Sequence, residues 1–166
     1  MKKKFKLFVV LLSALIVFTV LAACGSDGGK KQEVSRYKID AVYDEENKTV
    51  SAEMSLSYYN GTDAILDEIC FHLYPAAFRD GARFSPVPQD ISTAYPEGMS
   101  FGGIAVNSVS LNGEEKTVEI AGEDEDILVV KLPEEGLYPG QRAAVNVGFT
   151  LTLPNIRHRF GYIGST

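Results

Sequence analysis

The chain has 166 residues, with 16 Lys and Arg against 22 Asp and Glu, and its formal net charge is −6. Four of the lysines lie within the first six residues, so residues 24–166 keep 12 basic and 22 acidic side chains, a formal charge of −10. Nucleic acid repels a domain of this charge, which argues against nucleic-acid binding.

The N-terminal residues show the three segments of a secretory signal peptide. Lys2, Lys3, Lys4 and Lys6 precede an apolar run over residues 7–20, which leads into Leu21-Ala22-Ala23-Cys24. A basic start, a short apolar segment and small residues at the cleavage point are what such a peptide requires. The ending Leu-Ala-Ala-Cys resembles the lipobox of bacterial lipoproteins. That resemblance implies cleavage before Cys24 and attachment of a diacylglyceryl group to its thiol.

A single transmembrane helix is the alternative interpretation of the apolar run. Crossing a bilayer takes about 20 apolar residues, and the run is slightly short. The transmembrane-helix interpretation also does not explain why the apolar run ends at a cysteine that is followed by Gly25-Ser26-Asp27-Gly28-Gly29. We therefore expect a signal peptide over residues 1–23, and the lipidated Cys24 with a flexible linker over residues 24–35. The chain would be lipid-anchored at the cell membrane, because the two acyl chains of a diacylglyceryl group anchor stably. It would face the extracytoplasmic side, because a secretory signal peptide directs export.

From residue 36 onward, alternating apolar and polar residues predict half-buried β-strands. A hairpin is expected over residues 37–58 with its turn at residues 44–48, and Asn112-Gly113 marks a second hairpin. The remaining strands are predicted within residues 65–74, 104–111, 116–120, 127–132 and 143–153. No helical periodicity of useful length is present. The prediction is an all-β fold, an antiparallel β-sandwich formed as one domain by residues 36–166.

Two segments interrupt this pattern. The segment 75–103 holds four of the seven prolines, and a loop of that length is functional or packs as a cover over the core. The acidic run 123–126 is interpreted as a solvated turn, because a calcium site needs ligands spaced around a loop.

No residue carries a recognisable catalytic or metal-binding pattern. His72 and His158 are far apart in sequence and lack neighbours at metal-ligand spacing. His72 is expected in the core or at an interface. With Cys24 lipidated, Cys70 has no disulfide partner and is expected to be a small buried hydrophobe. Asn60-Gly61-Thr62 is interpreted as a turn rather than a glycosylation site.

The stretch from Leu153 to Tyr162 places Arg157, His158 and Arg159 among apolar residues. It is either an anion-binding patch or a solvated strand edge, and the second interpretation is favoured. After it, residues 163–166 contain no closing strand, so we expect the domain to be incomplete at its C-terminal end and the chain to be the front of a longer protein.

Four blocks of sequence follow one another in a recognisable order. They are Tyr37-Lys38-Ile39-Asp40 with Lys48-Thr49-Val50-Ser51-Ala52 and Tyr58-Tyr59-Asn60; Leu66-Asp67-Glu68-Ile69-Cys70-Phe71-His72-Leu73-Tyr74-Pro75 with Ala77-Phe78-Arg79; Val109-Ser110-Leu111-Asn112-Gly113; and Arg157-His158-Arg159-Phe160-Gly161-Tyr162. In this order, over residues 36–162, they resemble the N-terminal domain of aminopeptidase N-like (gluzincin) zinc metallopeptidases.

The resemblance implies a saddle-like, non-catalytic β-sandwich that packs on a catalytic peptidase domain in cis and shapes its substrate cleft. The family's His-Glu-x-x-His helix and Gly-x-Met-Glu-Asn strand do not occur here, and Gly98-Met99-Ser100 does not match the latter. We therefore expect no cofactor in this chain and zinc only in the missing catalytic domain. The alternative is a stand-alone β-sandwich lipoprotein that acts as a binding or scaffolding module.

Overall fold

The computed structural model describes residues 33–83 and 91–164. The predicted signal peptide, with Leu21, Ala22, Ala23 and Cys24, lies outside these residues, as does most of the predicted linker. No helix among the described residues is both long enough and apolar enough to span a bilayer.

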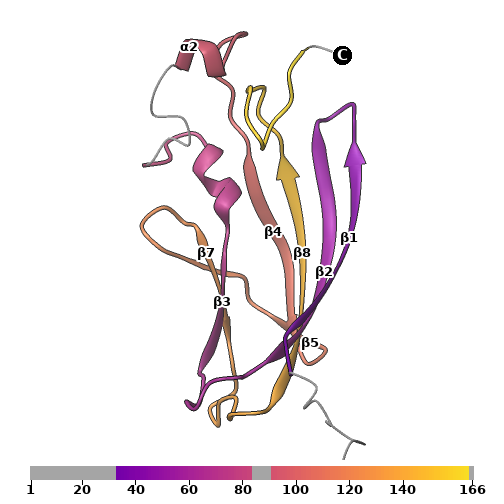
Figure 1. Cartoon of the computed structure of the whole chain (residues 1–166), viewed down its shortest axis with the longest axis vertical. Helices are drawn as coiled ribbons and strands as arrows, with labels where there is room; N and C mark the ends of the chain where they lie inside the picture. Colours follow the sequence, from indigo (N-terminus) through magenta and orange to yellow (C-terminus); the bar gives the residue numbers. More distant parts are fainter. Residues whose placement is uncertain (1–32, 84–90, 165–166) are drawn as a thin grey trace, which may run out of the picture. The chain divides into compact units, whose positions relative to one another are not determined.

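The fold is all-β and consists of two antiparallel sheets (Figure 1). The larger sheet has five strands in the order β1-β2-β8-β4-β5 and the smaller has three in the order β3-β7-β6. The bounds are β1 Arg36–Asp44, β2 Thr49–Tyr59, β3 Glu68–His72, β4 Gly103–Leu111, β5 Glu114–Lys116, β6 Glu119–Ala121, β7 Ile127–Lys131 and β8 Arg142–Thr152. The predicted antiparallel β-sandwich class is confirmed, including the first hairpin and the Asn112-Gly113 turn.

The helices of the described residues are short, a 3-10 helix η1 (Tyr74–Phe78) and a single helical turn α2 (Ile91–Ala94), which agrees with the lack of helical periodicity in the sequence. One detail of the sequence prediction is wrong. Residues 116–120 do not form one returning strand. β5 ends at Lys116 and β6 begins at Glu119 in the other sheet, because Val118 turns inward and packs on the core between them.

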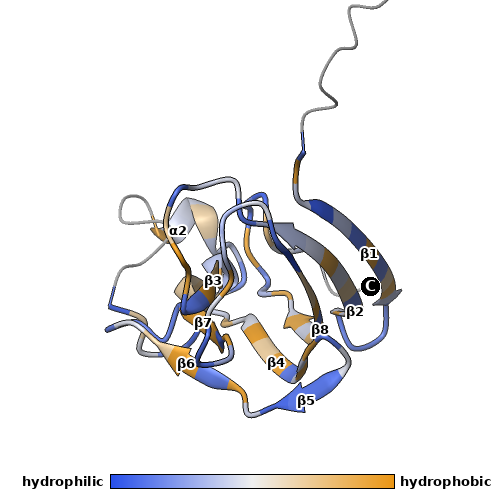
Figure 2. Cartoon of the chain, turned by 90° about the horizontal axis from the view of Figure 1, so that it is seen from below, coloured by the Kyte–Doolittle hydropathy of each residue, from blue (hydrophilic) through white to orange (hydrophobic). Residues whose placement is uncertain are grey.

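The main core lies between the two sheets, which Figure 2 shows on either side of it when the strands are viewed nearly end-on. The alternation in β2 and β8 explains which side chains enter the core. Leu56 pairs with Val145 and Met54 with Val147, so one face of both strands is apolar. The fully or largely buried members are Leu56, Ile69, Leu73, Ala76, Val109, Leu111, Leu128, Val130, Leu137, Ala143, Val145 and Val147.

A second, smaller cluster closes one end of the sandwich. Phe78, Ala94, Tyr95 and Ile156 are buried there, with Phe160 packed against them. We call this region, formed by residues 74–83, 91–102 and 153–162, the end lobe. Backbone hydrogen bonds from Gly102 N to Phe78 O (2.9 Å) and from Arg157 N to Ala94 O (2.8 Å) hold its three segments together. The described part of the proline-rich segment is therefore a packed cover.

Candidate functional site

The end lobe carries a polar cluster centred on Arg79, whose side chain is only 28% exposed. Arg79 Nη2 donates a hydrogen bond to the carbonyl oxygen of Asp124 (3.0 Å) and lies 3.7 Å from Asp124 Oδ1. Arg79 Nε lies 3.7 Å from Glu125 Oε2. The backbone N–H of Arg83 donates to Asp124 Oδ1 (3.0 Å), and the Arg83 guanidinium pairs with Glu123.

The acidic run 123–126 is a turn with Glu123 and Glu125 exposed, as expected. Asp124 departs from the expectation, because it is drawn toward the end of η1 from the β6–β7 connection. The described residues contain no group of three or more His, Cys, Asp or Glu side chains that could hold a metal ion. The cluster therefore joins two distant segments by charge and does not resemble a cation site.

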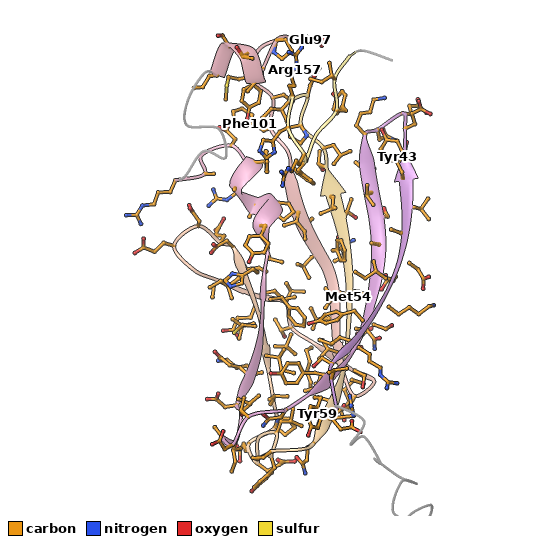
Figure 3. All side chains as sticks on the ribbon, viewed as in Figure 1. Tyr43, Met54, Tyr59, Glu97, Phe101 and Arg157 are labelled. Atoms are coloured by element: carbon orange, nitrogen blue, oxygen red, sulfur yellow. The ribbon has the colours of Figure 1, made fainter. Side chains whose placement is uncertain are left out.

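A hollow of about 380 Å³ lies beside this cluster. Its lining comes from η1, the start of β4, the β6–β7 connection and the end of β8, and comprises Ala76, Arg79, Phe101, Gly102, Gly103, Ile104, Ala105, Glu125 and Thr152. Figure 3 places Phe101 at the same end of the sandwich as Glu97 and Arg157, and Tyr59 at the other end. The Phe101 ring is 47% exposed. The hollow has a mostly apolar lining with one Arg–Glu pair, a composition suited to contact with another chain.

His72 is exposed, so of the two expected positions, core or interface, the core position is wrong. Its neighbours Ile69 and Phe71 take the inward positions of β3, and alternation turns His72 outward. The imidazole stacks on the Tyr74 ring, with centroids 5.3 Å apart and an interplanar angle of 21°.

Cys70 is also exposed, so the prediction of a small buried hydrophobe is wrong for the same reason of alternation. Its thiol donates a weak hydrogen bond to Glu68 Oε1 (3.5 Å), and Glu68 Oε2 pairs with Lys131 Nζ (2.5 Å). Partial burial of the sulfur, followed by its hydrogen bond to Glu68 and the negative charge of that carboxylate, raises the pKa of Cys70. The hydrogen bond from Lys131 lowers the pKa of Glu68.

We predict that Cys70, although exposed, reacts slowly with iodoacetamide near pH 8, because a raised pKa leaves less thiolate. Glu68→Gln removes both the hydrogen-bonded carboxylate and its charge and should lower the thiol pKa, so alkylation at this pH should become faster. The pH dependence of the rate, followed by mass spectrometry, measures the shift. Asp67→Asn is the matched control, because Asp67 makes the smallest contribution. An equal acceleration in both variants would contradict the assignment.

The basic residues of the tail are solvated, as both interpretations require, and they lie in a series of bends over residues 156–161 after β8 has ended at Thr152. Arg157, His158 and Arg159 are exposed, and the His158 ring packs at a tilt on Phe78 with centroids 5.4 Å apart. The two histidines therefore lie on different elements, and the structure does not bring them together with other metal-ligand side chains of the described chain.

Asn60 is a structural residue that the sequence pattern indicated only as part of a turn. It is 0% exposed and hydrogen-bonded on every side. Its Nδ2 donates to the carbonyl oxygens of Ala64 (2.9 Å) and Leu137 (2.8 Å), and its Oδ1 accepts from Thr62 N (3.0 Å) and Thr62 Oγ1 (2.7 Å). Asn followed two residues later by Thr was the available signal, because Asn side chains close such turns.

The described residues expose apolar side chains in several places, among them the end lobe and β1. In the end lobe, Ile91, Met99 and Phe101 are exposed. In β1, all nine residues are exposed, although a half-buried strand was predicted. The register Tyr37–Leu56 and Ile39–Met54 puts Tyr37 and Ile39 on the core face of the sheet, but the three-stranded sheet is too narrow to cover them.

Searches for similar proteins found no matching family model, no matching curated protein and no matching solved structure.

Proposed function

We propose that this chain is the non-catalytic N-terminal portion of a membrane-anchored, extracytoplasmic zinc metallopeptidase of the aminopeptidase N-like kind. In this role the β-sandwich packs on a catalytic domain and shapes its substrate cleft. The ordered sequence blocks motivate the family, and the Leu-Ala-Ala-Cys ending motivates the lipid anchor at Cys24.

The observation that carries the proposal is the apolar surface of the end lobe. Ile91, Met99 and Phe101 are exposed around segments that are otherwise held together by hydrogen bonds, and Phe101 borders the hollow beside Arg79. Three exposed apolar side chains within one well-packed lobe are what a contact surface would provide. Two of the four blocks that resemble the peptidase family supply parts of this lobe, namely residues 74–79 and 157–162.

The first test is to read the coding sequence beyond Thr166. The proposal expects an open frame that encodes a His-Glu-x-x-His segment. A stop codon directly after Thr166 would contradict it and would leave the stand-alone binding or scaffolding module.

The second test uses the complete gene product. Phe101→Lys should weaken docking of the two domains and raise the KM for an aminoacyl substrate, because a charge would be buried at the contact. Tyr138→Lys is the matched control and should leave KM unchanged, because Tyr138 is as exposed as Phe101 but lies outside the end lobe. Equal behaviour of the two variants would contradict the assigned docking surface.

The anchor gives a separate prediction. Cys24→Ser should abolish incorporation of a clickable fatty acid and release the chain from the membrane fraction, because the thiol is the proposed attachment point. Cys70→Ser is the control and should label and fractionate like the parent chain. Membrane retention of Cys24→Ser without label would favour the transmembrane-helix interpretation instead.

A further inference from the structure

β1 is an edge strand with an unusually open hydrogen-bonding side. In the strand order β1-β2-β8-β4-β5 its single neighbour among the described residues is β2 (Figure 1). The nine residue pairs with β2 run without a register shift, so no bulge bends the strand away from an incoming partner. Arg36–Asp44 contains no proline. Such an edge is a template for pairing with another strand.

The side chains of β1 do not prevent another strand from pairing with this edge either. Ile39 is 56% exposed on the core face of the sheet, and Val42 is 71% exposed on the opposite face. Lys38 and Asp40 also lie on the opposite face, and they neutralise each other through an ion pair of 2.6 Å. The strand thus offers apolar surface on both faces and little net charge.

The sequence of β1 is complementary to itself when two copies run antiparallel with Ile39 opposite Ile39. On the core face, Tyr37 of each copy then lies opposite Ala41 of the other, so a large side chain meets a small one on both sides of the central pair. Residues with the same parity face each other, so the apolar faces of the two sheets join on one side.

The opposite face of the same arrangement is complementary in charge. Lys38 of each copy lies opposite Asp40 of the other, and each already pairs along its own strand. The four side chains form a quartet in which every charge has only opposite charges as nearest neighbours. Opposite charges across strands stabilise pairing, and like charges weaken it.

Neighbouring registers lack this match. Centring the pair on residue 38 places Lys38 opposite Lys38, and centring it on residue 40 places Asp40 opposite Asp40. Centring on residue 41 shortens the overlap and requires Lys38 to face Asp44. Both carboxylate oxygens of Asp44 already accept hydrogen bonds from Asn47, at 3.0 and 2.7 Å.

We propose that two copies of this chain associate through their β1 edges, antiparallel about Ile39, and join their five-stranded sheets into one continuous sheet. The partner is a second copy because the large–small pairing on one face and the charge quartet on the other arise together in one register. This contact uses the strand edge and not the end lobe, so it stands or falls independently of the proposed function.

The test is cross-linking of the full chain expressed in bacteria, in a Cys70→Ser background, with copper phenanthroline as oxidant. In Ile39→Cys, the two introduced cysteines lie directly opposite, with Cβ atoms about 5 Å apart, near the separation that a disulfide needs. A reducible species of twice the chain mass is expected on a non-reducing gel. In the matched control Val42→Cys, the more exposed position, the two cysteines lie about 20 Å apart along the strands and should not cross-link.

Equal cross-linking at positions 39 and 42 would indicate random collision and overturn the proposal, as would absence of cross-linking at position 39. The parent Cys70→Ser chain controls for the thiol of Cys24.

A charge exchange provides a second readout that does not depend on cysteine. In sedimentation experiments in detergent, Lys38→Asp should raise the dissociation constant of the dimer about tenfold or more, because it creates a quartet of like charges. Adding Asp40→Lys restores alternation and should restore the dimer. Failure of the double variant to recover, with both variants folded by circular dichroism, would overturn the assigned register.

Discussion

Asn60→Ala is expected to lower the free energy of unfolding of residues 34–166, which form one compact unit, by about 3 kcal/mol. The substitution removes the buried N–H groups that donate to the carbonyl oxygens of Ala64 and Leu137, and it removes the acceptor for Thr62. Because Asn60 is fully buried, water cannot replace these partners without opening the loop. Urea unfolding followed by circular dichroism gives the difference.

Asn47→Ala is the matched control for this prediction. Asn47 makes the same kind of side-chain and backbone hydrogen bonds, to Asp44, but in an exposed turn. Water competes there, so the expected loss is below about 1 kcal/mol. Similar losses in the two variants would show that burial of Asn60 does not decide its contribution.

Gly102→Ala should destabilise the same unit by about 2 kcal/mol or more, for a steric reason. A methyl group at this position would overlap the carbonyl oxygen of Thr152 and lie 2.5 Å from Cδ of Pro154, a fully buried residue. The N–H of Gly102 also donates to Phe78 O, so a shift of this backbone would loosen the end lobe. Thermal unfolding and proteolysis within the lobe should both respond.

Gly61→Ala is the matched control, because its methyl group would meet only the Tyr59 ring at ordinary contact distance. We expect a change within about 0.5 kcal/mol. If Gly102→Ala were equally neutral, the backbone at the junction of the lobe and β4 would have to be more adaptable than this packing implies.

The strands were predictable because their signal is local. Alternation along β2 and β8 identifies Leu56, Val145 and Val147 as core residues, and the structure buries all three. The sequence did not show how much of the larger sheet the smaller sheet would cover. Whether Tyr37 and Ile39 are covered depends on the width of a second sheet, which is built from distant segments.

The same limit applies to the side chains of the candidate site. Arg79 and Asp124 are 45 positions apart and belong to segments without regular periodicity, so only the fold brings them together. Asn60 gave a turn signal, but its burial arises from Leu137 and Gln141, far along the chain. For Cys70 and His72, a strand was correctly predicted within residues 65–74 and forms as Glu68–His72. The apolar residues on both sides of this run did not show which face was inward.

The position of β8 has a consequence for the order in which the chain folds. β8 lies between β2 and β4 in the larger sheet, although it is the last strand in sequence. The β1–β2 hairpin and the β4–β5 hairpin therefore cannot share a sheet until residues 142–152 are available, and pairing at such sequence separation is slow. On the proposed secretory route, this topology would keep the larger sheet incomplete until residues 142–152 had crossed the membrane.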